Sequence, residues 1–237
     1  MDKIEEKLWK RVERYAWLFR IVPFIRFAAV CNNLAFGVVT DKSDVDIFIV
    51  AKKRRLYIAW AFANFLTRLF GVRTYGEKNA GRFCLSFMVD EGTIGFSRIA
   101  VKNDIYLANW IYHLIPVVDR GIGSKVAAKN KWILPIVKKG DFVFDFVSGR
   151  SRVKRDFFLL YLVRKFFEIL MFGPVGNLFE VIFRSLAFRR LRKRKGSILL
   201  KDMIKLHEND RRVAFRELYL KSGSGDFVAF LGTLPKN

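Results

Sequence analysis

Two aspartates one residue apart, at the start of a strongly apolar run, constrain this chain more than any other feature of its sequence. Asp44 and Asp46 lead into Ile47–Val50, whose branched and aromatic side chains favour a buried strand. Because side chains alternate between the faces of a strand, both carboxylates are expected on one face. Two carboxylates that close repel each other unless a cation lies between them. The pair therefore predicts a metal site on a sheet.

The residues before the pair predict a turn that can approach a phosphate. An apolar run of strand length, 25–30, is followed by small residues from Asn32 to Gly37. Such a turn lets backbone N–H groups come close to an anion. Carboxylate oxygens at a strand end suit Mg²⁺, which keeps coordination positions open for water and phosphate oxygens. We therefore expect a magnesium site beside a phosphate-binding turn.

The segment 30–50 resembles the signature of the DNA polymerase beta-like nucleotidyltransferase superfamily. In that family a Gly-Ser pair in a tight turn is followed, after about a dozen residues, by Asp-x-Asp on the next strand. Asn32 and Asn33 occupy the Gly-Ser positions here, and Ser43–Asp46 matches the usual Ser-Asp-x-Asp. The resemblance extends over roughly residues 25–115.

The resemblance implies an enzyme that transfers a nucleoside monophosphate from a nucleoside triphosphate to an acceptor hydroxyl. Such enzymes hold two Mg²⁺ ions on three carboxylates, and the metals align the attacking and leaving oxygens. Carried over to this chain, Asp44 and Asp46 are the expected catalytic and metal-binding residues. The expected nucleotide-binding residues are Asn32, Asn33, Gly37 and Ser43.

This chain departs from the family pattern first in the turn. Asn33 can still donate a hydrogen bond to a phosphate through its amide. Asn32 places a side chain where the family has none, although asparagine tolerates left-handed backbone better than most residues.

The second departure concerns the third carboxylate, which the family places on a later strand. Within the predicted strand 82–89 the corresponding residue is Ser86, and acidic residues follow only at its end, at Asp90 and Glu91. Asp90 is the candidate third metal ligand. The alternative is a nucleotidyltransferase fold with reduced catalysis, which binds RNA or an anionic membrane.

The charge of the chain favours anionic partners. It contains 44 Lys and Arg against 22 Asp and Glu, a net charge of +22. Such a field attracts nucleic acid, nucleotides or anionic lipid, so an anionic acceptor such as RNA is expected. Residues 184–195 hold seven basic residues and no acidic one within a Phe- and Leu-rich helix. This segment predicts a contact with RNA phosphates or with an anionic membrane, or alternatively a solvated face over a Phe core.

Periodicity predicts a mixed α/β (α+β) fold. Helical spacing covers 3–21, 55–70 and 104–114, and strand-like runs cover 25–30, 44–51 and 82–89. We therefore predict a small mixed-sheet nucleotidyltransferase domain over residues 1–149. A basic, Phe-rich helical region is predicted over 150–237, with two helices divided by Gly173, Pro174 and Gly176.

Other features bear on location. Glu168, Asn177, Glu180 and a Gly-Pro break argue against a transmembrane span over 166–183. Cys31 and Cys84 lack the spacing of a zinc site or of a disulfide framework. The first residues lack an apolar signal core. We expect a cytoplasmic protein, with peripheral contact to a membrane as an alternative.

Overall fold

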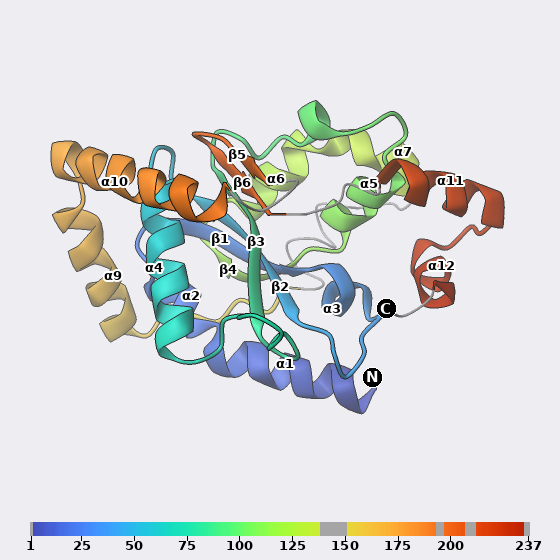
Figure 1. Ribbon diagram of the computed structural model, residues 1–237, viewed down its shortest axis with the longest axis horizontal. Helices are drawn as coiled ribbons and strands as arrows, with labels where there is room; N and C mark the ends of the chain where they lie inside the picture. Colours follow the sequence, from blue (N-terminus) through green and yellow to red (C-terminus); the bar gives the residue numbers. More distant parts are fainter. Residues whose placement is uncertain (1, 138–150, 193–196, 207–211, 235–237) are drawn as a thin grey trace.

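A six-stranded mixed sheet with helices on both faces forms the centre of the molecule (Figure 1). The computed structural model describes residues 2–137, 151–192, 197–206 and 212–234. The strands are β1 (Ile25–Cys31), β2 (Val45–Ala51), β3 (Phe83–Asp90), β4 (Ile115–Asp119), β5 (Ile198–Leu199) and β6 (Met203–Lys205), in the order β4-β1-β2-β3-β6-β5. Strands β2 and β3 are parallel, and the other neighbouring pairs are antiparallel. The predicted α/β class is confirmed.

Alternation along the strands divides the core into two layers. Ile47 and Ile49 of β2 face one hydrophobic cluster, and Phe48 and Val50 face the other. The first layer is covered by α1 (Lys3–Tyr15), α2 (Trp17–Ile21), α4 (Leu56–Leu69) and α10 (Gly173–Leu191). The second is covered by α3 (Asn32–Phe36), α5 (Ile105–Tyr112), α6 (Gly123–Lys129), α7 (Leu134–Val137), α11 (Arg212–Ser222) and α12 (Phe227–Thr233), with short 3-10 turns at Ser97–Ile99 and Lys131–Ile133.

The elements of the first half follow the sequence patterns closely. The predicted helix 3–21 is interrupted at Ala16, which separates α1 from α2. Helix α4 ends before Gly71, whose positive φ of 64° suits a glycine. Asp104 caps α5 through a carboxylate oxygen that accepts a hydrogen bond from the Leu107 N–H at 2.9 Å. Apolar periodicity and local capping chemistry therefore decide these elements.

Strand β4, which contains Pro116, is not among the strand-like runs that the sequence predicts. The structure instead pairs Pro116 with Ala29 in β4, at the edge of the sheet. Proline is tolerated there because an edge strand does not need all of its N–H groups.

The predicted boundary near Gly149 lies outside the described residues, but residues on both sides of it build one sheet. Strand β6 pairs with β3, with Met88 opposite Ile204, and β5 continues the sheet beyond it. Helix α10 packs on α4, and α11 packs on α5. The C-terminal region 150–237, predicted as a basic, Phe-rich helical region, contains helices that contribute to both layers and also supplies two strands.

Helices α9 (Phe158–Leu170) and α10 lie at one end of the molecule, at the left of Figure 1. They meet at 92° across Met171 and Phe172, and Gly173 begins α10 with a positive φ of 60°. Among the described residues, no single helix is long and apolar enough to cross a membrane. The pair α9 and α10 has sufficient length and apolar composition only when the two bent helices are taken together.

Candidate functional site

Asp44, Asp46 and Cys84 form a compact cluster at the start of β2 and β3. One ligand atom from each lies within 4.8 Å of the others. Strand pairing produces this arrangement, because Asp46 lies opposite Cys84 on β3 and opposite Cys31 on β1. Asp44 directly precedes β2 rather than lying within it. The two aspartates thus converge as the alternation of a strand predicts.

The turn before Asp44 is held by Ser43. Its hydroxyl oxygen accepts a hydrogen bond from the Thr40 N–H at 2.9 Å, and its carbonyl accepts one from the Gly81 N–H at 2.8 Å. Ser43 is buried. Of the predicted nucleotide-binding residues, Ser43 therefore positions Asp44 within the loop rather than presenting its hydroxyl to solvent.

The turn after β1 brings Asn32 onto the cluster. Asn32 adopts a left-handed φ of 55°, the conformation that favours glycine, and its side chain hydrogen-bonds Asp46. Its amide oxygen also accepts a hydrogen bond from the Tyr106 hydroxyl at 3.4 Å. Asn33, next along the chain, is exposed. The Asn-Asn pair thus supplies one residue that orients a carboxylate and one that faces solvent.

Gly37 ends α3 with a positive φ of 73°. Its N–H donates to the Leu34 carbonyl at 3.3 Å, so this N–H closes the helix and is not directed at a phosphate. The structure shows a role for Gly37 in the turn, and its contact with a phosphate stays a prediction.

The cluster holds the carboxyl groups of Asp44 and Asp46 close together and largely shielded from water. Burial raises the pKa of Asp46 to about 7, with a further contribution from the charge of Asp44. Hydrogen bonds from Asn32, Cys84 and Ser86 oppose this rise in the pKa. Burial likewise raises the pKa of Asp44. A divalent cation between the two carboxylates would remove the cost of ionising both.

Asp90 does not join this cluster. It pairs with Ala51, five residues from Asp46 along β2, which is roughly 16 Å away at the rise of a strand. Its carboxylate accepts hydrogen bonds from the Gly92 N–H at 2.8 Å and the Arg54 N–H at 3.4 Å. The candidate third ligand is therefore corrected: Asp90 stabilises the turn after β3. Among the described residues, the third member of the cluster is Cys84.

The donor set fits a hard cation held by two carboxylates. Burial, together with Asp46 and Asp44, raises the pKa of the Cys84 thiol to about 12, so it is protonated at neutral pH. A thiol is a hydrogen-bond donor and a poor ligand, whereas Mg²⁺ takes oxygen ligands and keeps several waters. Cys84 hydrogen-bonds both carboxylates and so orients the two ligands. Asp44 and Asp46 could thus hold Mg²⁺ with water in the remaining positions.

A basic pocket adjoins the acidic pair. It has a volume of about 370 Å³ and is lined by Arg68, Gly71, Arg73, Tyr75, Lys78 and Arg82. Arg73 connects the pocket to the cluster, because its positive charge acts to lower the pKa of Asp44, which burial raises. The Arg73 guanidinium is held by the Asn64 side-chain oxygen at 3.1 Å and the Phe83 carbonyl at 2.9 Å. Carboxylates for a cation and cations for phosphate oxygens thus lie side by side.

Sequence reasoning missed Cys84 and Arg73. Neither belongs to a local motif with Asp44 and Asp46, because the β2–β3 register and the loop after α4 bring them to the site. In comparisons with protein-family models, with curated proteins and with solved structures, no match was found. Proposals about function therefore rest on the residues and their geometry.

Proposed function

We propose that this protein is a Mg²⁺-dependent nucleotidyltransferase that transfers a nucleoside monophosphate from a nucleoside triphosphate to an acceptor hydroxyl. The observation that carries this proposal is the convergence of Asp44 and Asp46 at the start of β2, beside the left-handed turn at Asn32. The adjoining basic pocket supports it, because a triphosphate needs cations beyond the metal.

In this proposal the chain positions and neutralises its substrates. Mg²⁺, when bound, supplies charge neutralisation and alignment of the reacting oxygens. Asn32 fixes the orientation of Asp46 by hydrogen bonding. Arg73 and Arg82 bind phosphate oxygens of the triphosphate, and exposed Asn33 donates its amide to the same group. The net charge of +22 favours an anionic acceptor, and RNA is the candidate.

The test is calorimetric titration of the protein with each nucleoside triphosphate, with and without Mg²⁺. Asp44→Asn is expected to weaken Mg²⁺-dependent binding at least roughly tenfold, because a carboxylate ligand is lost. The matched control is Asp41→Asn, which removes the same charge from an exposed position three residues earlier. Binding that survives unchanged in Asp44→Asn would contradict the proposal.

Cys84 and Ser86 on β3 favour a second candidate function. They stand beside Asp46 where the resemblance leads one to expect a carboxylate. In this alternative the fold binds RNA without catalysis. Its expected signature is RNA affinity that falls steeply with salt, together with no Mg²⁺-dependent nucleotide binding. RNA binding that is insensitive to salt would exclude it.

A further inference from the structure

Helix α9 presents its charged side to the protein and its apolar side to solvent. Arg164 is only 5% exposed, and its guanidinium donates to Glu168 at 3.1 Å, one turn along the same helix. Phe158, at 75% exposure, and Ile169, at 73%, lie on the opposite side. An amphipathic helix of a water-soluble surface has the reverse orientation, with its apolar stripe on the core.

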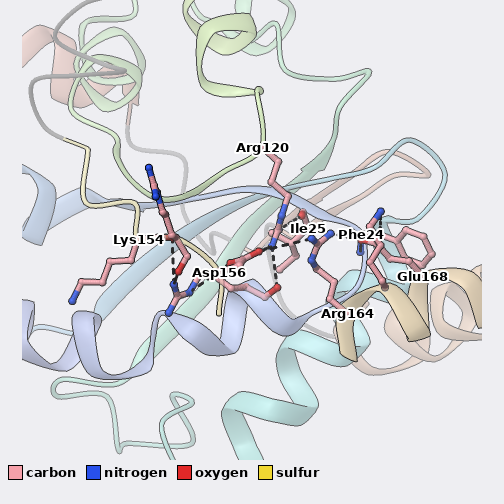
Figure 2. Close-up of polar contacts among 10 residues, drawn as sticks. Phe24, Ile25, Arg120, Lys154, Asp156, Arg164 and Glu168 are labelled. Atoms are coloured by element: carbon pink, nitrogen blue, oxygen red, sulfur yellow. Dashed lines mark hydrogen bonds and ion pairs between the residues drawn. The ribbon is translucent and has the colours of Figure 1, made fainter. Parts of the chain in front are cut away.

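A buried charge network fixes this orientation (Figure 2). Asp156, just before α9, accepts a hydrogen bond from Arg120 at 3.1 Å and lies 3.8 Å from Arg164. Arg120 also donates to the Ile25 carbonyl, and Glu168 accepts from the Phe24 N–H at 3.2 Å. The polar side of α9 is thus attached to the start of β1, and its apolar side cannot rotate inward without breaking these contacts.

Helix α10 also exposes an apolar side, although Ala187 and Leu191 on its inward side belong to the core. Glu180 is buried, and its two carboxylate oxygens accept hydrogen bonds from the Tyr57 N–H at 2.9 Å and the Ile58 N–H at 3.0 Å, in the first turn of α4. Leu178, Ile182 and Leu186 are exposed on the other side of α10. Two consecutive helices therefore expose apolar faces.

We define the α9–α10 outer face as the exposed apolar side chains of both helices. These are Phe158, Leu159, Leu162, Phe166, Ile169, Leu170, Val175, Leu178, Val181, Ile182 and Leu186. The apolar surface continues onto α4 through Phe65, across an open groove of about 570 Å³ between α4 and α10. Apolar side chains exposed in this number on two consecutive helices mark a contact with another apolar medium.

The exposed charged side chains within 151–192 are all positive. The acidic residues of 151–192 are Asp156, Glu168 and Glu180, and all three are engaged with the protein as described above. Arg155 is exposed just before α9, and Arg189 and Arg190 are exposed at the end of α10. Cations at the margin of an apolar face complement anionic lipid headgroups above an acyl layer.

We propose that the α9–α10 outer face binds the surface of an anionic lipid bilayer, with its apolar side chains at the boundary between headgroups and acyl chains. A second copy of the chain fits this face less well, because its marginal cations would meet cations and no exposed carboxylate of 151–192. RNA fits it less well, because aliphatic side chains such as Ile169 and Leu178 have neither a charge nor a hydrogen-bond donor to bind a phosphate group.

The test is sedimentation of the full-length protein with vesicles of phosphatidylcholine containing about one-third phosphatidylglycerol, and with vesicles of phosphatidylcholine alone. Strong binding to the anionic vesicles and weak binding to the neutral ones is expected. The double variant Phe166→Ser/Ile169→Ser is expected to lose binding at least roughly tenfold. Arg189→Ala and Arg190→Ala are each expected to reduce it roughly fivefold at low salt.

The matched control is Leu218→Ser/Leu220→Ser, which removes comparably exposed apolar side chains from α11 at the other end of the molecule. It is expected to bind as the wild type does. A second readout is the fluorescence of an introduced tryptophan. The emission of the tryptophan in Phe166→Trp is expected to shift to shorter wavelength on anionic vesicles. Leu220→Trp is expected to show no such shift.

Three outcomes would overturn the proposal. One is equal binding of the α9 double variant and the wild type. Another is equal binding to neutral and anionic vesicles. The third is a dimer in lipid-free sedimentation velocity that the α9 variant dissociates, combined with no vesicle binding, which would identify the partner as a second copy.

Discussion

The start of β2 and the α9–α10 outer face both depart from the usual distribution of side chains, but in opposite directions. At β2 two carboxylates lie half-buried against each other, and on α9 and α10 large apolar side chains lie in water. Each arrangement costs free energy in the isolated chain. The two arrangements call for partners of different size. A single cation can neutralise the two carboxylates, whereas covering eleven apolar side chains takes an extended apolar surface.

The largest expected effect concerns the network that keeps the charged side of α9 inward. Asp156→Ala leaves Arg120 and Arg164 without their shared carboxylate, and the unfolding free energy is expected to fall by about 3 kcal/mol. Chemical denaturation measures this. Glu13→Ala is the control, because Glu13 pairs with Arg152 at the surface and its loss is expected to cost less than about 1 kcal/mol. Equal losses would show that the network does not hold α9.

Asp46→Asn is expected to stabilise the metal-free protein at pH 8 by on the order of 3 kcal/mol. Because burial raises the pKa of Asp46 from its ordinary value of 3.8 to about 7, the folded state binds the proton more tightly than the unfolded state. Wild-type stability therefore falls as the pH rises from about 4 to about 7, and the variant lacks this fall. Unfolding curves across that range measure the difference.

Mg²⁺ provides the control for this second prediction. It is expected to stabilise the wild type at pH 8, because it replaces the proton between the carboxylates, and to have little effect on Asp46→Asn. If the unfolding free energies of the two proteins changed in parallel across the pH range, the carboxyl group with the raised pKa would not be that of Asp46.

A smaller effect is expected at the turn after β1. Asn32→Ala and Asn32→Gly both lose the hydrogen bond to Asp46, but alanine must also adopt the left-handed φ of 55°. The unfolding free energy of Asn32→Ala is therefore expected to be about 1 kcal/mol lower than that of Asn32→Gly. The same two substitutions at Asn33, inside α3, are expected to rank in the opposite order, since glycine costs more in a helix. If alanine and glycine ranked in the same order of stability at both positions, the left-handed backbone conformation of Asn32 would be contradicted.

The smallest expected effect is on the outer face itself. Phe166→Ser and Ile169→Ser are each expected to change the unfolding free energy in lipid-free buffer by less than about 1 kcal/mol, because both side chains already lie in water. Phe48→Ala, at a fully buried position, is expected to cost about 3 to 5 kcal/mol. A large loss at Phe166 would mean that the outer face packs against the protein.

The sequence predicts the parts of this structure that depend on local pattern. The convergence of Asp44 and Asp46 follows from the two-residue period of a strand, and the end of α4 follows from Gly71. Strands β5 and β6 could not be predicted, because two and three residues carry no alternation and their pairing with β3 depends on tertiary contact. Cys84 belongs to the site only through the β2–β3 register.

The inward side of α9 illustrates a different limit of sequence reasoning. Periodicity shows that one side of α9 is charged and the other apolar, but it does not show which side faces the protein. That choice depends on Arg120 and Phe24, which are distant in the sequence and supply the polar contacts of Asp156 and Glu168. The usual rule that apolar faces point inward would place this helix the wrong way round.

The pairing of β3 with β6 has a consequence for how the chain must be made. Met88 and Ile204 are neighbours in the sheet but are separated by most of the C-terminal half of the sequence. The chain emerges from the ribosome with its N-terminus first. Strand β3 can therefore pair with β2 early, but it cannot pair with β6 until residue 205 has emerged. Its unpaired N–H and C=O groups can then pair with another chain. Folding of this protein therefore finishes late in synthesis, and one edge of β3 stays unpaired longest in chains that are translated slowly.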